Sequence, residues 1–305
     1  MTPLELVRLP PLMARTSGSP AVTIGLIDGP IGRHPDLADT RRQDVGLPAG
    51  SACAVATSAA CRHGTFIAGI LFARRGSIAP AICPDCTMLA RPIFAERTAH
   101  GGGDVMPATT PNELAAAILD CLRGGARILN ISAAIAPAAL RAERALDEAL
   151  GHAADRGAIV VVAAGNDGTL GSSTLTRHPW VIPVVAYDGR GRPLGASTFG
   201  GSIGRNGLGA PGEQVTSLGT ADQPVALSGT SAAAPFVTGA VALLWSLVPD
   251  ASPAAIKLAI SRPVPGRRHT VVPPLLDAWT ALDTLQRLHT RRRWAHLRQG
   301  YGGQA

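Results

Sequence analysis

The chain has 305 residues, of which 46% are apolar and only 16% charged, and its formal net charge is +7. A long disordered protein is excluded, because disordered chains are poor in apolar residues and rich in charge. No uninterrupted apolar run approaches the ~18 residues that a membrane span requires, so we expect no membrane span. Eight arginines and two aspartates between residues 262 and 305 supply +6 of the charge. The rest of the chain therefore needs no basic groove, and we expect no nucleic-acid partner.

Short runs rich in β-branched residues alternate with longer stretches of helical character. Predicted strands cover residues 21–27, 87–94, 127–131, 158–164 and 180–187. Predicted helices cover residues 63–74, 111–123, 138–156, 232–247 and 253–261. This alternation predicts an α/β fold in three layers, with a mostly parallel sheet and helices on both of its faces.

The same pattern indicates how the chain is divided. Residues 21–285 fit one α/β domain better than two, because no linker interrupts the alternation. Residues 1–20 are an N-terminal extension, and residues 286–305 are a basic, Gly-rich tail that we expect to be partly disordered. Within residues 275–297 a basic amphipathic helix is expected, and we favour packing of its apolar residues onto the domain: Leu276, Trp279, Leu282 and Leu285.

Four polar residues lie at ends of the predicted elements. Asp28 follows the first strand, Asn166 follows the strand over 158–164, His63 opens a helix, and Ser231 precedes another helix. Ligands of parallel sheets bind beyond the carboxyl ends of the strands. Taken singly, these residues are a turn former, a cap or a surface histidine. Taken together, they are the residue types that acyl transfer requires.

The residues around these four positions resemble one known family. Ile24–Leu37 (IGLIDGPIGRHPDL), Arg62–Ile70 (RHGTFIAGI) and Leu227–Leu244 (LSGTSAAAPFVTGAVALL) are similar to the aspartate, histidine and serine blocks of subtilisin-like serine proteases. Val160–Gly168 (VVVAAGNDG) resembles the strand that presents the oxyanion asparagine. The order Asp, His, Ser is also that of subtilisin. The resemblance implies the three-layer subtilisin-like fold.

The resemblance also implies the chemistry of a serine endopeptidase that works through an acyl-enzyme. Ser231 would be the nucleophile, His63 the general base and then the acid, and Asp28 the carboxylate that orients the imidazole. The side-chain amide of Asn166 and the backbone N–H of Ser231 would hold the oxyanion. We expect no cofactor and no bound metal, and the oligomeric state is left open.

In this family the substrate binds as an extended peptide between two backbone segments. The counterparts here are the residues around Gly101 and Gly102, and a second segment made of Ser132, Ala133 and Ala134. Gly165, beside the oxyanion asparagine, is a further candidate for substrate binding. The substrate would be a peptide or a protein, since strand addition relies on main-chain hydrogen bonds.

This chain departs from the family pattern at three places. Gly29 and Pro30 stand where the family has Ser or Thr after the aspartate, and Phe66 replaces a second histidine. Ser132-Ala133-Ala134-Ile135 replaces a Ser-Leu-Gly-Gly sequence. No chemistry-bearing residue is lost, so the departures bear on which side chains the specificity pockets prefer.

A narrower resemblance rests on Asp28-Gly29-Pro30 and on residues 77–94, which are similar to proteases of the cyanobactin type. It implies cytoplasmic processing of a ribosomal precursor peptide. We expect hydrolysis rather than cyclisation, because no inserted capping element separates the blocks. The segment Met1–Pro20 is a poor secretory signal, which also favours the cytoplasm. The alternatives are a catalytically inactive peptide-binding protein of the same fold and a general intracellular subtilase.

Five cysteines, an odd number, do not indicate a disulfide scaffold. Cys83 and Cys86 form a C-x-x-C pair. Together with Cys53 and Cys61 they could remain free thiols, form a disulfide or bind zinc through four thiolates. Free or occasionally bridged thiols are the default interpretation. Cys121 is expected to be a small core residue. His34, in a His-Pro-Asp-Leu sequence, is interpreted as structural, and no Asp/Asn loop has the spacing of calcium ligands.

Overall fold

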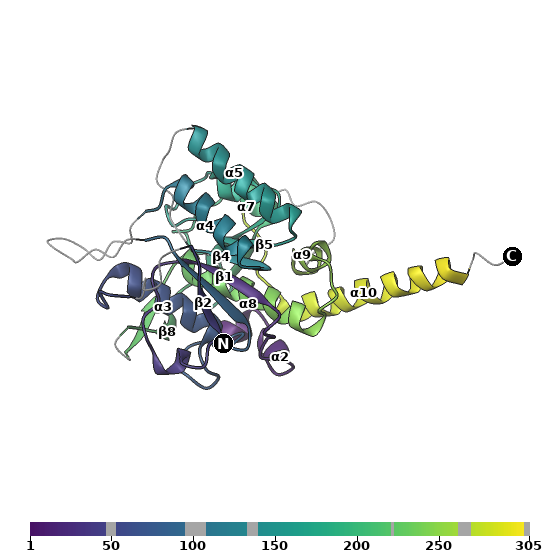
Figure 1. The fold of residues 1–305 in the computed structure, drawn as a ribbon, viewed down its shortest axis with the longest axis horizontal. Coiled ribbons are helices and arrows are strands. Elements are labelled where there is room, and N and C mark those ends of the chain that lie inside the picture. Colours follow the sequence, from purple (N-terminus) through teal and green to yellow (C-terminus); the bar gives the residue numbers. More distant parts are fainter. Residues whose placement is uncertain (47–52, 95–107, 133–139, 221–222, 262–269, 302–305) are drawn as a thin grey trace.

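The computed structural model describes residues 1–46, 53–94, 108–132, 140–220, 223–261 and 270–301, with the backbone alone for residues 140–142 and 291–301. Within these ranges seven parallel strands form the main sheet, in the order β2-β3-β1-β4-β5-β6-β7 (Figure 1). The strands are β1 (Thr23–Asp28), β2 (Arg42–Asp44), β3 (Thr87–Pro92), β4 (Ile128–Ile131), β5 (Ile159–Ala163), β6 (Val181–Tyr187) and β7 (Leu208–Pro211). The predicted α/β fold is confirmed.

The strand order of the sheet reverses at β1, which lies between β3 and β4. The chain adds β3 and β2 on one side of β1 and then β4 to β7 on the other. This is the position at which open α/β sheets bind their ligands, beyond the carboxyl ends of the strands. Asp28 ends β1, and Ser132 directly follows β4.

Helices cover both faces of the sheet, because successive strand residues point to opposite faces and both sets are apolar. In β1, Ile24 and Leu26 join the core on one face, and Ile27 joins the core on the other. The helices of the first face are α3 (Ala59–Phe72), α8 (Thr230–Leu247), α9 (Pro253–Ser261) and α10 (Ala278–Tyr301). The other face is covered by α4 (Pro111–Arg123), α5 (Leu140–Asp155) and α6 (Thr174–Arg177) (Figure 1).

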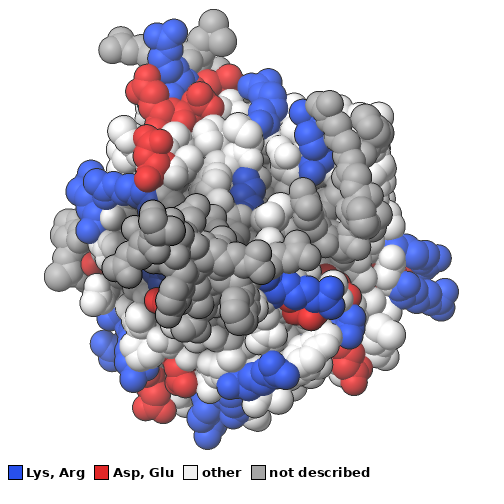
Figure 2. All heavy atoms as spheres, turned by 90° about the vertical axis from the view of Figure 1, so that its right-hand side faces the viewer, with Lys and Arg blue, Asp and Glu red and all other residues white. Residues whose placement is uncertain are grey.

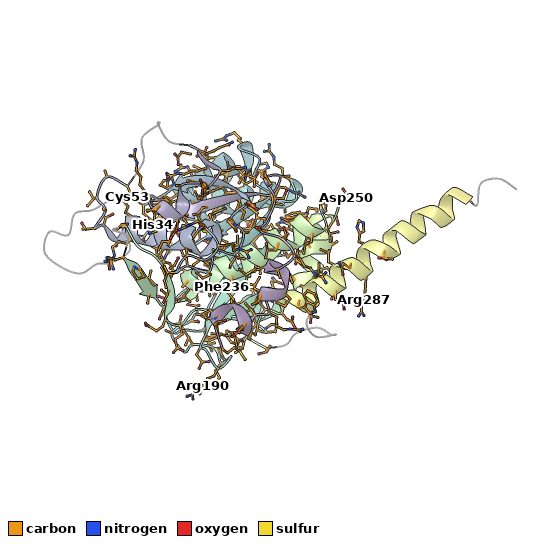
Figure 3. The ribbon with its side chains drawn as sticks, turned by 90° about the horizontal axis from the view of Figure 1, so that it is seen from below. His34, Cys53, Arg190, Phe236, Asp250 and Arg287 are labelled. Carbon is orange, nitrogen blue, oxygen red and sulfur yellow. A yellow bond between two sulfur atoms is a disulfide. The ribbon has the colours of Figure 1, made fainter. Side chains whose placement is uncertain are left out.

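Helix α8 runs through the first core and is the most enclosed of these helices. It begins at Thr230, two residues earlier than predicted, and almost all of its residues as far as Trp245 are buried. Phe236 lies in the middle of the molecule (Figure 3). Among the described residues α8 is the one helix long and apolar enough to cross a membrane, but most of it is already buried inside the protein.

Several short elements were not predicted. They are β2, β7, the antiparallel pair β8 (Val215–Leu218) and β9 (Pro224–Leu227), the 3-10 turn η1 (Pro35–Leu37), and the helices α1 (Pro3–Leu6), α2 (Pro10–Met13), α6 and α7 (Gly201–Asn206). Each has only three to six residues, too few for a hydrophobic period to emerge. The other predicted strands and helices are present, with ends shifted by a few residues, and α4 has the predicted bounds.

The N-terminal extension is part of the main core. Helices α1 (Pro3–Leu6) and α2 (Pro10–Met13) bring Val7, Leu9 and Leu12 into the core that surrounds α8, where all three are fully buried. The backbone N–H of Ala278 donates to the Val7 carbonyl at 3.0 Å. This N-terminal segment is thereby attached to the start of α10.

Helix α10 confirms the expected packing of the 275–297 segment. Leu276, Leu282 and Leu285 are buried, and Trp279 packs against the same core. The helix then continues to Tyr301 and extends away from the body of the molecule (Figure 1). Most of the residues assigned to a tail are therefore helical.

The cysteines divide into one disulfide and three buried thiols. Cys53 and Cys61 are bonded to each other, while Cys83, Cys86 and Cys121 are free. The four-thiolate zinc site is therefore not formed. Cys121 is a core residue as predicted, and burial raises the pKa of its thiol to about 12. Within the described residues no three His, Cys, Asp or Glu side chains gather as metal ligands.

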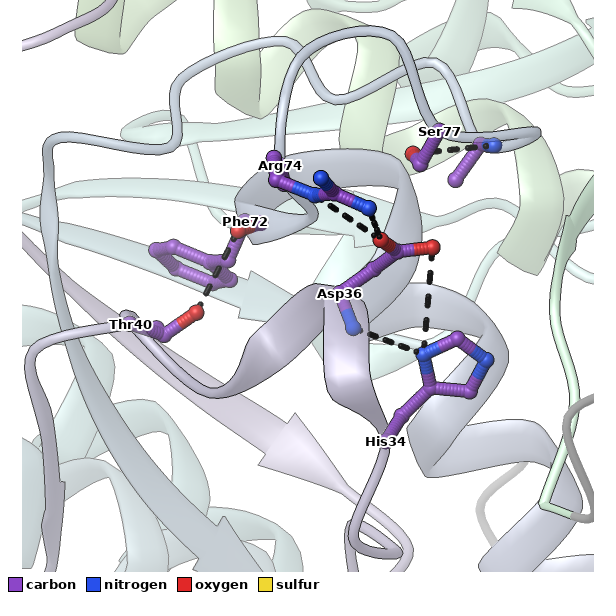
Figure 4. A network of polar contacts seen from close by, with 7 residues as sticks. His34, Asp36, Thr40, Phe72, Arg74 and Ser77 are labelled. Atoms are coloured by element: carbon purple, nitrogen blue, oxygen red, sulfur yellow. Dashed lines mark hydrogen bonds and ion pairs between the residues drawn. The ribbon is translucent and has the colours of Figure 1, made fainter.

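His34 confirms its structural interpretation, since it holds Asp36, and Asp36 in turn joins the loop after β1 to the residues that follow α3 (Figure 4). The backbone N–H of Asp36 donates to His34 Nδ1 at 3.1 Å, which caps η1. Arg74 donates from Nε and from a terminal guanidinium nitrogen to Asp36 Oδ1, at 3.1 and 2.8 Å. A second bond runs from the Thr40 hydroxyl to the Phe72 carbonyl at 3.2 Å.

The packing of α2 predicts the effect of shortening one side chain there. Leu12→Ala should reduce the free energy of unfolding by about 2–5 kcal/mol, because a large buried side chain is removed. Leu170→Ala is the matched control, since Leu170 is 77% exposed, and its effect should stay within about 0.5 kcal/mol. Urea unfolding of both variants measures the difference. Equal, small losses would show that the N-terminal segment does not belong to the core.

Candidate active site

A buried carboxylate and a buried imidazole are in direct contact where β1 ends. Nδ1 of His63 lies 2.7 Å from Oδ1 of Asp28. Asp28 is fully buried and His63 is 7% exposed. Since a carboxylate only accepts hydrogen bonds, Nδ1 carries the hydrogen in this contact. In the neutral imidazole the other ring nitrogen, Nε2, then carries the lone pair, which is the form that a general base needs.

The Asp28 carboxylate is further fixed by the backbone. The N–H of Gly29 donates to Asp28 Oδ1 at 2.6 Å, so the same oxygen accepts from both partners. The second oxygen, Oδ2, has no hydrogen-bond partner among the residues that the structure describes. Both observed bonds therefore run through Oδ1, and together they fix how the carboxylate faces the imidazole.

The prediction that His63 opens a helix was wrong. His63 lies in the second turn of α3. The helix begins at Ala59, where the Ser58 side chain accepts from the Cys61 N–H at 3.2 Å. The sequence signal was a serine before two alanines, a strong capping residue followed by helix formers. The Cys53–Cys61 disulfide also attaches the preceding loop to this first turn.

Gly29 allows α3 to approach the end of β1. A Cβ at Gly29 would overlap the carbonyl group of Ala60, in the first turn of α3, and backbone atoms cannot move aside as the end of a side chain can. The residue that looked like a departure from the family pattern is therefore required by the close packing of α3 here. This contact sets the distance between β1, which ends in Asp28, and the helix that carries His63.

Asn166 is held in one orientation by the residue before Ser231. Its Oδ1 accepts from the Thr230 N–H at 2.9 Å and from the Thr230 hydroxyl at 3.1 Å. An N–H cannot accept, so the atom facing it must be the amide oxygen. The Nδ2 group of Asn166 is therefore the end that remains to donate, and Asn166 itself is exposed.

The loop that carries Asn166 is attached to α8 by a second bond. The N–H of Gly165 donates to the Thr230 hydroxyl at 3.2 Å, and the Gly165 carbonyl accepts from the Thr198 N–H at 2.9 Å. Both backbone groups of Gly165 thus have partners inside the protein. The structure gives Gly165 a part in holding the Asn166 loop, and its predicted contact with substrate stays a prediction.

Ser231 lies in the first turn of α8, partly exposed, directly after Thr230. Helix α8 begins after Gly229, whose φ of +133° favours glycine and where a Cβ would lie only 3.1 Å from atoms of the Asn166 amide. The positive end of the helix macrodipole lies at this turn. Because α3 packs against α8, His63 and Ser231 lie on neighbouring helices.

The predicted substrate-binding residues are only partly described. Gly101, Gly102, Ala133 and Ala134 lie outside the described residues. Ser132 is 4% exposed, and its hydroxyl lies 3.4 Å from the Ser231 carbonyl oxygen. The residue that sequence reasoning missed is Thr230, which orients Asn166. Its only sequence signal was its place in Gly-Thr-Ser.

Comparison with known proteins agrees with this arrangement. Residues 19–296 match the Subtilase family. A thermostable alkaline protease from Halalkalibacterium halodurans is 29% identical over 232 residues, which are 74% of this chain and 57% of that protein. The chain thus spans little more than half the length of this curated relative. The protein belongs to the subtilase family, peptidase family S8.

Solved structures with the same fold include two maturation proteases. The prenylagaramide maturation protease PagA aligns with a TM-score of 0.76 and 26% identity, covering 91% of this chain and 98% of PagA. A serine-to-alanine mutant of the PatA protease domain aligns with a TM-score of 0.76 and 28% identity, covering 88% of this chain and 96% of that domain. The predicted resemblance to subtilases and to this narrower group is confirmed.

The contact at Gly29 generates a prediction. Gly29→Ser, which restores the residue type usual in the family, should lower the free energy of unfolding by about 1–3 kcal/mol, because a side chain is forced into packed backbone. It should also abolish the downfield proton NMR signal of the Asp28–His63 hydrogen bond. Gly195→Ser is the control, since a Cβ there meets nothing within 4 Å. An unchanged signal in Gly29→Ser would show that the close approach does not position the pair.

Proposed function

We propose that this protein is a serine endopeptidase that hydrolyses peptide bonds through an acyl-enzyme, with Ser231 as nucleophile, His63 as general base and Asp28 as the orienting carboxylate. The observation that carries the proposal is the buried Asp28–His63 contact at 2.7 Å. This contact orients the imidazole of His63 on α3. Ser231 lies at the start of α8, the helix that packs against α3.

The first half of the reaction forms the acyl-enzyme. Nε2 of His63 takes the hydroxyl proton while Oγ of Ser231 attacks the carbonyl carbon of the substrate. The carbonyl oxygen gains the π electron pair and becomes an oxyanion. The imidazolium, stabilised by Asp28, then donates its proton to the leaving amine as the C–N bond breaks. The peptide's amino-terminal part remains as an ester on Ser231.

The second half repeats the sequence with water. His63 takes a proton from water, the resulting hydroxide attacks the ester, and Ser231 recovers its proton as the carboxylic acid leaves. In both halves the Nδ2 group of Asn166 and the N–H of Ser231 donate to the oxyanion. A side-chain donor of this kind contributes about 10²–10³ in kcat, a figure measured in subtilisin. The bonds from Thr230 hold the donor ready before substrate arrives.

We further propose that the substrate is a precursor peptide. The support is the fold similarity to PagA, a maturation protease, and to the PatA protease domain. Hydrolysis rather than cyclisation remains our proposal for the fate of the ester. A cytoplasmic location is also proposed.

Two alternatives have weaker support. An inactive peptide-binding protein does not need an aspartate–histidine contact and an oriented asparagine, and the structure has both. For nucleic-acid binding, a continuous basic surface would be expected. On the face shown in Figure 2, the described Lys and Arg side chains are interspersed with Asp and Glu.

A fluorophosphonate probe tests the enzyme against the inactive binder. Wild-type protein should be labelled covalently, because the probe reacts with an activated serine, and Ser231→Ala should not be labelled. Ser228→Ala is the control, since Ser228 lies three residues away and bonds to Gln214 instead. Labelling is read by mass spectrometry. Absence of label from folded wild-type protein would support the inactive binder.

The substrate class is tested with a mixture of peptides from a digested proteome. A precursor protease should cut few peptides, all of which share a short sequence, because its substrate is a single class of peptide. Sequencing the new termini by mass spectrometry gives that sequence, and Ser231→Ala supplies the background. Cleavage of many unrelated peptides would instead support a general intracellular subtilase.

A further inference from the structure

The first turn of α8 lacks one of its helical hydrogen bonds. Residue 235 is a proline inside the helix. Proline has no N–H, so it cannot donate to the carbonyl of the residue four positions earlier, and its ring crowds that carbonyl. That residue is Ser231. The proposed nucleophile therefore belongs to a turn in which its own carbonyl oxygen needs a donor from elsewhere.

Strand β4 supplies a donor for this carbonyl. The hydroxyl of Ser132, the residue after β4, lies 3.4 Å from the Ser231 carbonyl oxygen and is the donor in this contact, because a carbonyl oxygen only accepts. Ser132 is 4% exposed. The donor is therefore shielded from solvent although Ser231 itself is partly exposed, and the hydroxyl takes the place of the missing N–H of Pro235.

The Ser132 hydroxyl is itself held by a fully buried asparagine. Asn130 Nδ2 donates to Ser132 Oγ at 3.1 Å, and the Thr238 hydroxyl donates to Asn130 Oδ1 at 2.8 Å. Thr238 lies on α8, about two turns after Ser231, and is also fully buried. The chain of bonds thus leaves α8 at Thr238, crosses β4 through Asn130 and Ser132, and returns to α8 at Ser231.

These polar groups stand where apolar residues would be the simpler choice. The other residues of β4 are Ile128, Leu129 and Ile131, and the helix that β4 contacts is almost entirely apolar. Burying an amide or a hydroxyl costs free energy unless it has a partner, and a linked set is stable only when its members are all present. A buried set of hydrogen bonds such as this one can fix the position of α8 against β4 more tightly than apolar contacts, which allow the two elements to shift.

We propose that Asn130, Ser132 and Thr238 are positioning residues, which fix the first turn of α8 so that the Ser231 hydroxyl and N–H face the substrate carbonyl. This inference rests on the proposed function. It also means that the Ser132 side chain positions Ser231 and does not bind the substrate. Because Ser132 directly follows β4, the same hydrogen bond sets the distance between the predicted substrate-binding segment and the nucleophile.

The test removes each donor without changing the shape of the core. Ser132→Ala removes the donor to the Ser231 carbonyl, and Thr238→Val replaces a hydroxyl by a methyl of similar size. Both should lower kcat and the rate of fluorophosphonate labelling by about 10- to 100-fold, since a misplacement of a reacting group by about 1 Å can cost about 10²-fold. KM should change by less than about twofold, since the ground-state contacts with peptide remain.

Two further variants separate positioning from general stability. Thr238→Ser keeps the hydroxyl and should restore the wild-type rates. Ser246→Ala removes a hydroxyl from the other end of α8, where it bonds to the Ala242 carbonyl at 2.8 Å, and should leave kcat unchanged. Urea unfolding shows that each variant is folded. Wild-type kcat in both Ser132→Ala and Thr238→Val, whatever their stability, would overturn the proposal.

Hydrogen exchange gives a readout that does not depend on activity. The amides of Ala233 and Ala234, in the first turns of α8, should exchange faster in Ser132→Ala and Thr238→Val than in wild-type protein. Unchanged exchange in both variants overturns the positioning role. If folded wild-type protein neither cleaves peptides nor reacts with the probe, the proposed function fails by itself, and this exchange measurement still decides the structural inference.

Discussion

The close contact between the end of β1 and the first turn of α3 is the constraint on which the site depends. Gly29 packs directly on the Ala60 carbonyl, and a Cβ at Gly64 would in turn collide with the Gly29 and Pro30 carbonyls. With backbone against backbone, the separation of strand and helix is not adjustable. The Asp28–His63 bond at 2.7 Å follows from that separation. The position of Asp28 against His63 is therefore set by main-chain packing more than by the two side chains themselves.

Helix α8 collects the remaining parts of the site through the few polar residues on an apolar helix. Thr230, at its start, holds the Asn166 amide, and Thr238 begins the chain of bonds through β4. Pro235 lies between them and weakens the helix at the turn that carries Ser231. The helix thus combines a rigid buried body with a first turn whose geometry is determined by neighbouring elements.

What the sequence could predict was local. Helix α4 was predicted with its observed bounds because Thr110, Pro111 and the glycines after Arg123 are all short-range signals, and the Thr110 side chain does cap the helix. The start of α3 was predicted four residues late, since the capping serine stood before two alanines that carry no amphipathic signal. The short strands were missed because only pairing with distant residues stabilises them.

The candidate site shows the same division. The residue types and their place at strand ends could be predicted from motifs, and the contact of Asp28 with His63 agrees with them. The part of Thr230 could not, since it bonds to a residue 64 positions away. The polar chain through Asn130 was equally hidden, because Asn130 and Thr238 are 108 positions apart in sequence and meet only in the packed core.

The attachment of the first helices to α10 has a consequence for the synthesis of the protein. Val7 and Arg8 leave the ribosome long before their partners Ala278 and Asp277, and 269 positions separate Arg8 from Asp277. Since a domain folds as a unit, the core around α8 stays incomplete until the start of α10 has been made. Folding of the early strands on the ribosome is therefore not enough to complete the domain, and the candidate site reaches its final form only after Ala278 has been added.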